Sequence, residues 1–147
     1  MSTRKLRRQP QREAPVSVRL PESLLESIRT QARRTGKPIS RLIREMLDMG
    51  LRMQRFPGIV FVEGPAGRRA HLAGTGLDVW EVIELLREYQ SPSTLREHFP
   101  RLSPMAIGIA EAYANAYPED ISTFLALNAR TPEQLKRELP WLEVVRS

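Results

Sequence analysis

The sequence has no cysteine, few aromatic residues and no long apolar run. The absence of cysteine from its 147 residues excludes a disulfide framework and any Cys-ligated metal site. No apolar stretch approaches the roughly 20 residues of a transmembrane helix. The basic N-terminus, MSTRKLRRQPQRE, lacks the apolar segment of a signal peptide. We therefore expect a cytoplasmic protein that needs no metal and no other cofactor.

Positive charge is concentrated towards the N-terminus. Residues 1–55 hold 14 Lys and Arg residues against 5 Asp and Glu, whereas residues 56–147 hold 9 against 12. All nine aromatic residues also lie in the second part. This contrast predicts two modules, and a basic first module is typical of proteins that bind nucleic acid. A solvated basic tail would explain the charges up to Arg12 but not the patterned ones that follow.

The segment PVSVRLP, residues 15–21, has the alternation of a half-buried β-strand. Its apolar residues alternate with Ser17 and Arg19. A single short strand cannot satisfy its own backbone N–H and C=O groups, and no nearby segment resembles a partner. The strand must therefore pair with something else.

Two amphipathic helices are predicted after this strand. Apolar residues recur at helical spacing over positions 24–32, and Gly36 ends that helix. A second apolar stripe covers positions 42–51, with Ser40 as the predicted N-cap. A unit of about 40 residues usually needs disulfides, metals or oligomerisation to fold. We therefore expect two chains to pair their strands antiparallel about a two-fold axis.

The stretch VSVRLPESLLESIRTQARRTGKPISRLIREML resembles a ribbon-helix-helix (CopG/Arc/MetJ-like) DNA-binding domain, the fold of small dimeric bacterial repressors. The resemblance covers residues 15–54 and implies that outward strand residues read base edges in the major groove. Those residues are Ser17 and Arg19. Pro15 stands where a polar residue is common, which leaves Arg19 as the main reader. An alternative is that Arg19 is a solvated charge protecting a strand edge.

Phosphate contacts are expected from the basic arm and from the start of the second helix. The resemblance implies that backbone N–H groups at that helix start grip a phosphate, which the helix dipole favours. Such contacts carry affinity, make binding salt-dependent and specify little. The candidate residues are Arg4, Lys5, Arg7, Arg8, Arg12, Lys37, Ser40 and Arg41.

The second module is predicted to be a β-hairpin followed by helices. Short strands over 59–62 and 69–72 flank EGPAG, which indicates a rather long hairpin loop. N-cap residues then precede three helices. The predicted helices are Val79–Tyr89 after Asp78, Pro92–Phe99 after Ser91, and Pro104–Tyr117 after Ser103.

The stretch from Gly74 to Ile121 is similar to a small bacterial helix-turn-helix domain of unknown function. The marks of that domain are Gly-Thr followed by Val-Trp, and an Ala/Tyr-rich helix before the pattern Pro-Glu-x-Ile, where x is any residue. The domain often occurs in antitoxins encoded beside PIN-like nuclease toxins, so the resemblance implies a toxin-binding or dimerising role. Gly76 stands where a basic residue is common, which weakens any nucleic-acid role of that turn.

Charge favours a protein partner over DNA for this second module. Residues 102–129 contain no Lys or Arg, although a recognition helix needs positive charge or amides near phosphates. The helix predicted over Pro104–Tyr117 has Met105 and Tyr113 on its inward face, and its outward positions, among them Ile107 and Ala110, are mostly small and apolar. The sequence of the C-terminal tail, residues 129–147, predicts a short helix before Pro140. We expect the tail either to bind a partner or to fold back on the second module. The candidate partner residues are Ile107, Glu111, Trp141, Leu142, Val144 and Val145.

These patterns predict a mainly α protein with short β elements. We expect a homodimer or higher oligomer that represses transcription as the antitoxin of a type II toxin–antitoxin pair, binding operator DNA and a PIN-like nuclease toxin. The alternative is a free-standing regulator or DNA-organising protein whose second module multimerises. Neither histidine has a nucleophile or carboxylate cluster around it in the sequence, so we do not expect an enzyme. Since we expect the protein to bind DNA, we expect it to be associated with the bacterial nucleoid. The expected divisions are an arm over 1–14, the DNA-binding domain over 15–54, the helix-turn-helix-like domain over 56–128 and the tail over 129–147.

Overall fold

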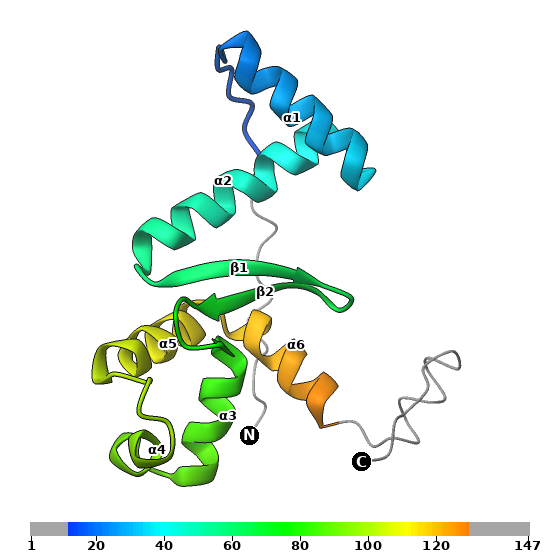
Figure 1. The fold of residues 1–147 in the computed structure, drawn as a ribbon. Helices are drawn as coiled ribbons and strands as arrows, with labels where there is room; N and C mark the ends of the chain where they lie inside the picture. Colours follow the sequence, from blue (N-terminus) through cyan, green and yellow to red (C-terminus); the bar gives the residue numbers. More distant parts are fainter. Residues whose placement is uncertain (1–11, 130–147) are drawn as a thin grey trace. The chain divides into compact units, whose positions relative to one another are not determined.

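The computed structural model describes residues 12–129, and these divide into two compact units. Six helices and three strands lie within this range, which confirms the predicted class of mainly α with short β elements (Figure 1). The division falls inside helix α2, between Arg44 and Glu45, and not after it. In the range described, no helix is both long and apolar enough to cross a membrane.

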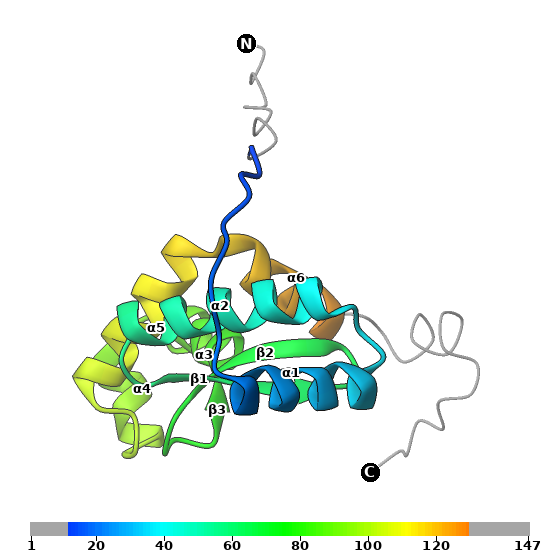
Figure 2. The ribbon, with the colours of Figure 1, turned by 90° about the horizontal axis from the view of Figure 1, so that it is seen from above.

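The first unit consists of an extended segment and a helical pair. Residues 12–20 form neither helix nor strand and run as an extended segment in Figure 2, and α1 (Glu22–Thr35) and the start of α2 (Ile39–Arg55) follow. Gly36 closes α1 as predicted, because its backbone takes the left-handed conformation, with φ of 66°. Within residues 12–129, no strand pairs with the extended segment. The ribbon partner is therefore not supplied by the described part of the same chain.

The start of α2 differs from its prediction by one residue. The helix begins at Ile39, and the Pro38 carbonyl accepts the Leu42 N–H at 3.1 Å. Ser40 is thus already inside the first turn, and its prediction as the N-cap was wrong. The physical reason is that Pro38 has a fixed backbone angle suited to a helix entry, so the helix starts directly after it.

In the second unit the end of α2 is followed by a three-stranded antiparallel sheet in the order β1-β2-β3. Strand β1 (Ile59–Gly64) pairs with β2 (Gly67–Leu72), and β2 pairs with the short β3 (Leu77–Asp78). The predicted hairpin is confirmed, but its loop is shorter than expected. Gly64 pairs with Gly67, so the turn itself is only Pro65 and Ala66.

Four helices follow the sheet in the part of the chain that the structure describes. Helix α3 lies between α5 on one side and α6 on the other in both views (Figures 1 and 2). The three predicted N-caps are confirmed: Ser91 and Ser103 each accept a backbone N–H, and Asp78 forms a capping box. Helix α6 was not predicted, although Pro118 and two acidic residues in its first turn are a start signal. The bounds are α3 Val79–Tyr89, α4 Pro92–His98, α5 Pro104–Ala116 and α6 Pro118–Asn128.

The core of the second unit forms between the hairpin and these helices. Phe56, just after α2, meets the Tyr113 ring edge-on at 5.4 Å. Burial of these apolar side chains is the main stabilising contribution. The buried members are Phe56, Ile59, Leu72, Val79, Val82, Leu95, Leu102, Ile107, Ala110, Tyr113 and Ile121.

The face that α5 turns to the core differs from its prediction. Ile107 and Ala110, expected to point outward, are 2% and 0% exposed, whereas Met105, expected inward, is 76% exposed. Only Tyr113 was placed correctly among the fully buried residues of this helix. The helix is apolar or small almost all round, so its sequence period does not specify which face is buried.

Candidate nucleic-acid interface and partner surface

The extended segment presents its candidate base-reading residues to solvent. Ser17 and Arg19 are both exposed. The alternating apolar residues are exposed too, since Val16 is 83% and Val18 72% accessible in the single chain. These exposed apolar side chains are the ones that the predicted pairing with a second strand would cover.

The other candidate DNA contacts gather at the turn between α1 and α2. Ser40 and Arg41 are exposed in the first turn of α2, which carries no acidic residue, and Lys37 just before them is half-buried. A shallow hollow of about 500 Å³ lies beside this turn, lined partly by Arg29, Arg33 and Lys37. Helix starts favour anions because of the helix dipole and the free backbone N–H groups.

The described part of the first unit is strongly basic. Residues 12–44 hold 8 Lys and Arg against 3 Asp and Glu. The recorded acid–base pairs are solvent-exposed: Glu26 binds Arg33 at 3.2 Å, and Glu13 binds Arg44 at 3.3 Å. Such surface pairs contribute little, so the unit keeps a net positive field for an anionic partner. Arg12 is exposed, while the candidates Arg4, Lys5, Arg7 and Arg8 lie outside the described residues.

The second unit holds a polar network that the sequence analysis missed. Arg52 Nη1 donates to Asp120 Oδ2 at 2.6 Å and to Tyr113 Oη at 2.9 Å, and Tyr113 donates to the same carboxylate at 3.0 Å. Arg52 Nε lies 3.1 Å from Asp48 Oδ2 without hydrogen-bond geometry. The guanidinium also lies 3.7 Å from the centre of the Tyr117 ring. The network therefore binds the end of α2 to α5 and α6.

The protonation states in this network are fixed by its geometry. Burial by itself lowers the pKa of Arg52, but the hydrogen bond to Tyr113 and the charge of Asp120 outweigh it and hold the pKa above its ordinary value. Burial raises the pKa of Tyr113 to about 12, against the opposing effect of Arg52. Arg52 is therefore charged and Tyr113 neutral at physiological pH, as the hydrogen bonds require.

Replacing Arg52 by leucine is expected to destabilise the second unit by about 1–3 kcal/mol, because Asp120 and Tyr113 lose a charged donor while partly buried. The free energy of unfolding from urea titration, at equal protein concentrations, measures this. Arg55→Leu is the matched control, since Arg55 is exposed on the same helix and only lies over the Phe56 ring at 5.1 Å. A surface change of that kind costs at most about 0.5 kcal/mol. Equal effects of the two changes would contradict a stabilising role for the network.

A second polar cluster surrounds Asp78, which is 7% exposed. Its carboxylate accepts from Arg69 Nε at 2.7 Å and from Trp80 Nε1 at 3.1 Å, and His71 Nδ1 lies 2.9 Å from it. The Asp78 N–H donates to Glu81 at 2.7 Å, which completes the capping box. The cluster joins β2 and β3 to the start of α3. Across residues 12–129, no three His, Asp or Glu side chains come together as a possible metal site.

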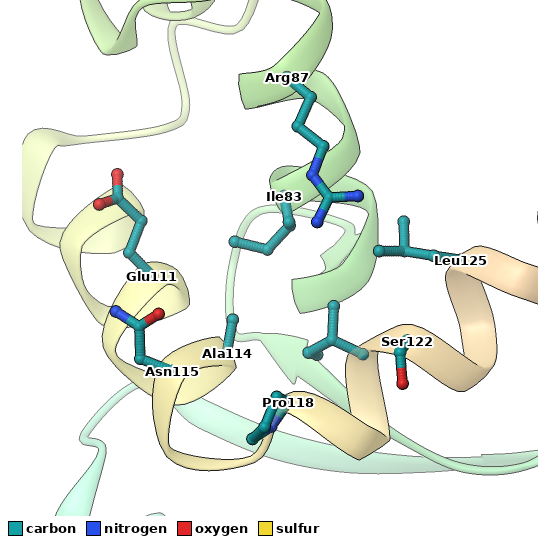
Figure 3. Close-up of a pocket in the computed structure, with 9 residues that line it drawn as sticks. Ile83, Arg87, Glu111, Ala114, Asn115, Pro118, Ser122 and Leu125 are labelled. Carbon is teal, nitrogen blue, oxygen red and sulfur yellow. The ribbon is translucent and has the colours of Figure 1, made fainter. Parts of the chain in front are cut away.

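A groove of about 370 Å³ lies between α3, α5 and α6 (Figure 3). Ile83, Ala114 and Leu125 contribute apolar surface, while Arg87 on α3 and Glu111 on α5 are polar members of its lining. Glu111, one of the candidate partner residues, is thus exposed beside this groove.

None of the other candidate partner residues lies on the exposed surface of the part of the chain that the structure describes. Ile107 is 2% exposed and belongs to the core, so its prediction as a partner contact was wrong. It fails because α5 is rotated relative to the predicted orientation, which turns Ile107 into the core of the second unit. Trp141, Leu142, Val144 and Val145 lie outside the described residues.

Comparison with known families gives two matches. Residues 1–49 match the family model described as CopG antitoxin of type II toxin-antitoxin system. The N-terminal third is similar to a type II antitoxin. Residues 59–114 match the model described as a protein of unknown function, DUF433. Comparisons with curated proteins and with solved structures find no match.

The antitoxin-like segment contains the whole candidate nucleic-acid interface. It includes the extended segment, α1 and the first part of α2, and therefore Ser17, Arg19, Lys37, Ser40 and Arg41. The match covers one third of the chain, and the likeness to a type II antitoxin holds for this segment. The second match covers the sheet and α3 to most of α5, and its description names no function.

Proposed function

We propose that this chain is a DNA-binding antitoxin that represses its own operon and neutralises a PIN-like nuclease toxin. Two chains pair their extended segments into an antiparallel ribbon, which enters the major groove with Arg19 and Ser17 outward. The turn before α2 binds phosphates. The second unit and the tail bind the toxin, and the chain itself carries out no reaction.

One observation carries the proposal: the exposed apolar side chains concentrate in the antitoxin-like segment and just beyond it. Of the ten large hydrophobic residues exposed in the described range, eight lie between residues 16 and 53. They include both valines of the extended segment and two residues of α2, Leu47 and Leu51, which are 63% and 67% exposed. Four of the eight lie in the first unit and four in the part of α2 that belongs to the second unit. Exposed apolar residues at this density are typical of a surface that a second chain covers.

The charge distribution supports separate roles for the two units, with DNA binding by the first and toxin binding by the second. Residues 12–44 are strongly basic, as a phosphate-binding surface must be. The exposed side of α5 instead carries Met105, Glu111 and Asn115, with no cation between residues 102 and 129. A surface of this composition suits a protein partner better than the phosphate backbone.

Affinity purification of the tagged full chain from its native cells tests both parts of the proposal. One half of the sample is crosslinked and its DNA sequenced; the other is digested with nuclease and its proteins identified by mass spectrometry. We expect enrichment of DNA upstream of the chain's own gene and one small nuclease-like protein in stoichiometric amount. DNA enrichment without such a protein would favour the free-standing or DNA-organising regulator. Recovery of neither would overturn the proposal.

A further inference from the structure

Three cations line the shallow hollow beside the turn between α1 and α2, within the first unit. Arg29 and Arg33 come from successive turns of α1, and Lys37 comes from the turn itself. The lining also includes the small residues Ala32 and Gly36, so little side-chain bulk stands between an approaching group and the backbone. The hollow is therefore positively charged and accessible to an anion.

One carboxylate joins the two arginines of this hollow. Arg33 Nη2 donates to Glu26 Oε1 at 3.2 Å, and Arg29 Nη1 lies 3.7 Å from Glu26 Oε2. Glu26 and Arg33 are seven positions apart, which is about 10 Å along the helix axis, so this pair is not an ordinary contact between adjacent turns. The two oxygens of a single anion therefore hold the two guanidinium groups close together.

A phosphodiester presents the same acceptors as this carboxylate. Its two non-bridging oxygens share one negative charge, and arginine binds carboxylates and phosphates with the same planar set of N–H donors. The present partner is easily exchanged, because the side chains of Arg29, Glu26 and Arg33 are 49%, 60% and 66% exposed. Ion pairs in such positions contribute little to stability. The arginine pair thus has the geometry of a phosphate site in which a weakly held carboxylate of the same chain takes the place of the phosphate.

We propose that Arg29 and Arg33 together bind one backbone phosphate of the DNA, and that Glu26 competes with this phosphate in the free chain. The inference rests on the DNA-binding role proposed above and adds two residues of α1 to its phosphate-binding surface. It also assigns to Glu26 a role that opposes binding.

The position of the hollow favours a DNA phosphate over a free anion. Lys37 lines the hollow and directly precedes the start of α2, where Ser40 and Arg41 are the candidate phosphate contacts. A duplex bound at that helix start brings its further phosphates to the hollow as part of the same molecule. Their effective concentration there is of the order of millimolar, as for any linked second contact.

The salt dependence of DNA binding by the full chain tests the role of the two arginines. Fluorescence anisotropy with a random-sequence duplex at about 50 to 200 mM salt gives the slope of log K against log[salt]. Arg29→Gln with Arg33→Gln is expected to reduce the magnitude of this slope by about 1.8, since each phosphate contact contributes about 0.9 and the dimer contains two chains.

Arg34→Gln with Arg44→Gln is the matched control for this double variant. Both residues are exposed in the first unit and lie outside the lining of the hollow, and their removal takes away the same formal charge. This control is expected to weaken the long-range attraction but to change the slope little, because it removes no phosphate contact.

The competition by Glu26 has a separate signature. Glu26→Gln is expected to tighten binding about two- to thirtyfold at fixed salt, because each chain of the dimer no longer has to release an ion pair. Glu22→Gln removes the same charge one turn earlier on α1, where the described residues contain no ion-pair partner for it, and is expected to tighten binding less. In a chain that already carries Arg29→Gln and Arg33→Gln, Glu26→Gln is expected to have no larger effect than Glu22→Gln.

The outcomes distinguish this inference from the proposed function. A wild-type chain that binds no duplex would overturn both. If the wild type binds the duplex and the Arg29→Gln, Arg33→Gln variant keeps its slope, the arginine site is wrong and the DNA-binding role stands. If that variant keeps its slope but loses an affinity of the wild type for inorganic phosphate, measured by calorimetry, the hollow takes a free anion and not DNA. Equal effects of Glu26→Gln and Glu22→Gln would contradict the competition.

Discussion

Replacing Arg19 by alanine is expected to weaken binding to the operator at least about tenfold, while binding to a scrambled duplex changes little. A bidentate arginine–guanine contact discriminates by about 1–3 kcal/mol, and each 1.4 kcal/mol is a factor of ten. The dimer loses one such contact from each chain, so the combined loss of about 2–6 kcal/mol corresponds to roughly thirtyfold to ten-thousandfold. Fluorescence anisotropy of labelled duplexes at fixed salt, about 150 mM, measures both affinities.

Arg34→Ala is the control for the loss of charge. Arg34 is exposed in the last turn of α1 and is not a candidate DNA contact. Its removal takes away the same formal charge, so long-range attraction falls by a similar amount in the two variants. We expect Arg34→Ala to affect operator and scrambled duplex alike. If Arg19→Ala behaves in the same way, Arg19 does not read bases and the ribbon orientation is wrong.

The readout by Arg19 is also separable from the partner surface. Arg19 is exposed on the extended segment, and the groove beside Glu111 belongs to the second unit. Co-purification of a protein partner with the Arg19→Ala chain is therefore expected to equal that of the wild type. This comparison distinguishes a loss of base contacts from a general loss of folded protein.

Local signals account for most of what the sequence predicted correctly. Gly36 ends α1 because a left-handed residue closes the helix, and Ser91 and Ser103 begin α4 and α5 because their hydroxyls accept free N–H groups. Each of these helix boundaries depends on a few neighbouring residues, which sequence patterns contain. The strand predicted over residues 15–21, by contrast, is not formed in the single chain, and its pairing with a second chain stays a prediction.

Features that depend on distant residues were missed. Arg52 meets Tyr113 and Asp120 across 61 and 68 positions of sequence, and no local pattern brings them together. The orientation of α5 failed for a related reason. Apolar and small residues surround that helix, so packing against α3 and the sheet, and not its own periodicity, decides that Ile107 is buried.

Replacing Val18 by glutamate is expected to abolish the dimer and, with it, DNA binding. Val18 is 72% exposed in one chain, and full burial of a valine contributes roughly 1.5–3 kcal/mol. The dimer contains two copies, so the change removes about twice that contribution and leaves two carboxylates at an apolar interface without partners. Size-exclusion chromatography with light scattering over a range of protein concentrations measures the association.

Val62→Glu is the matched control for this last change. Val62 is an exposed strand residue at 36%, and it stands opposite Arg69 in the β1–β2 pair, where a glutamate meets a cation. Because Val62 belongs to the second unit and not to the extended segment, its replacement is expected to leave the dimer intact. A Val18→Glu chain that remains dimeric would mean that the extended segments do not pair with each other. The exposed residues of α2, Leu47 and Leu51, would then have to carry the association by themselves.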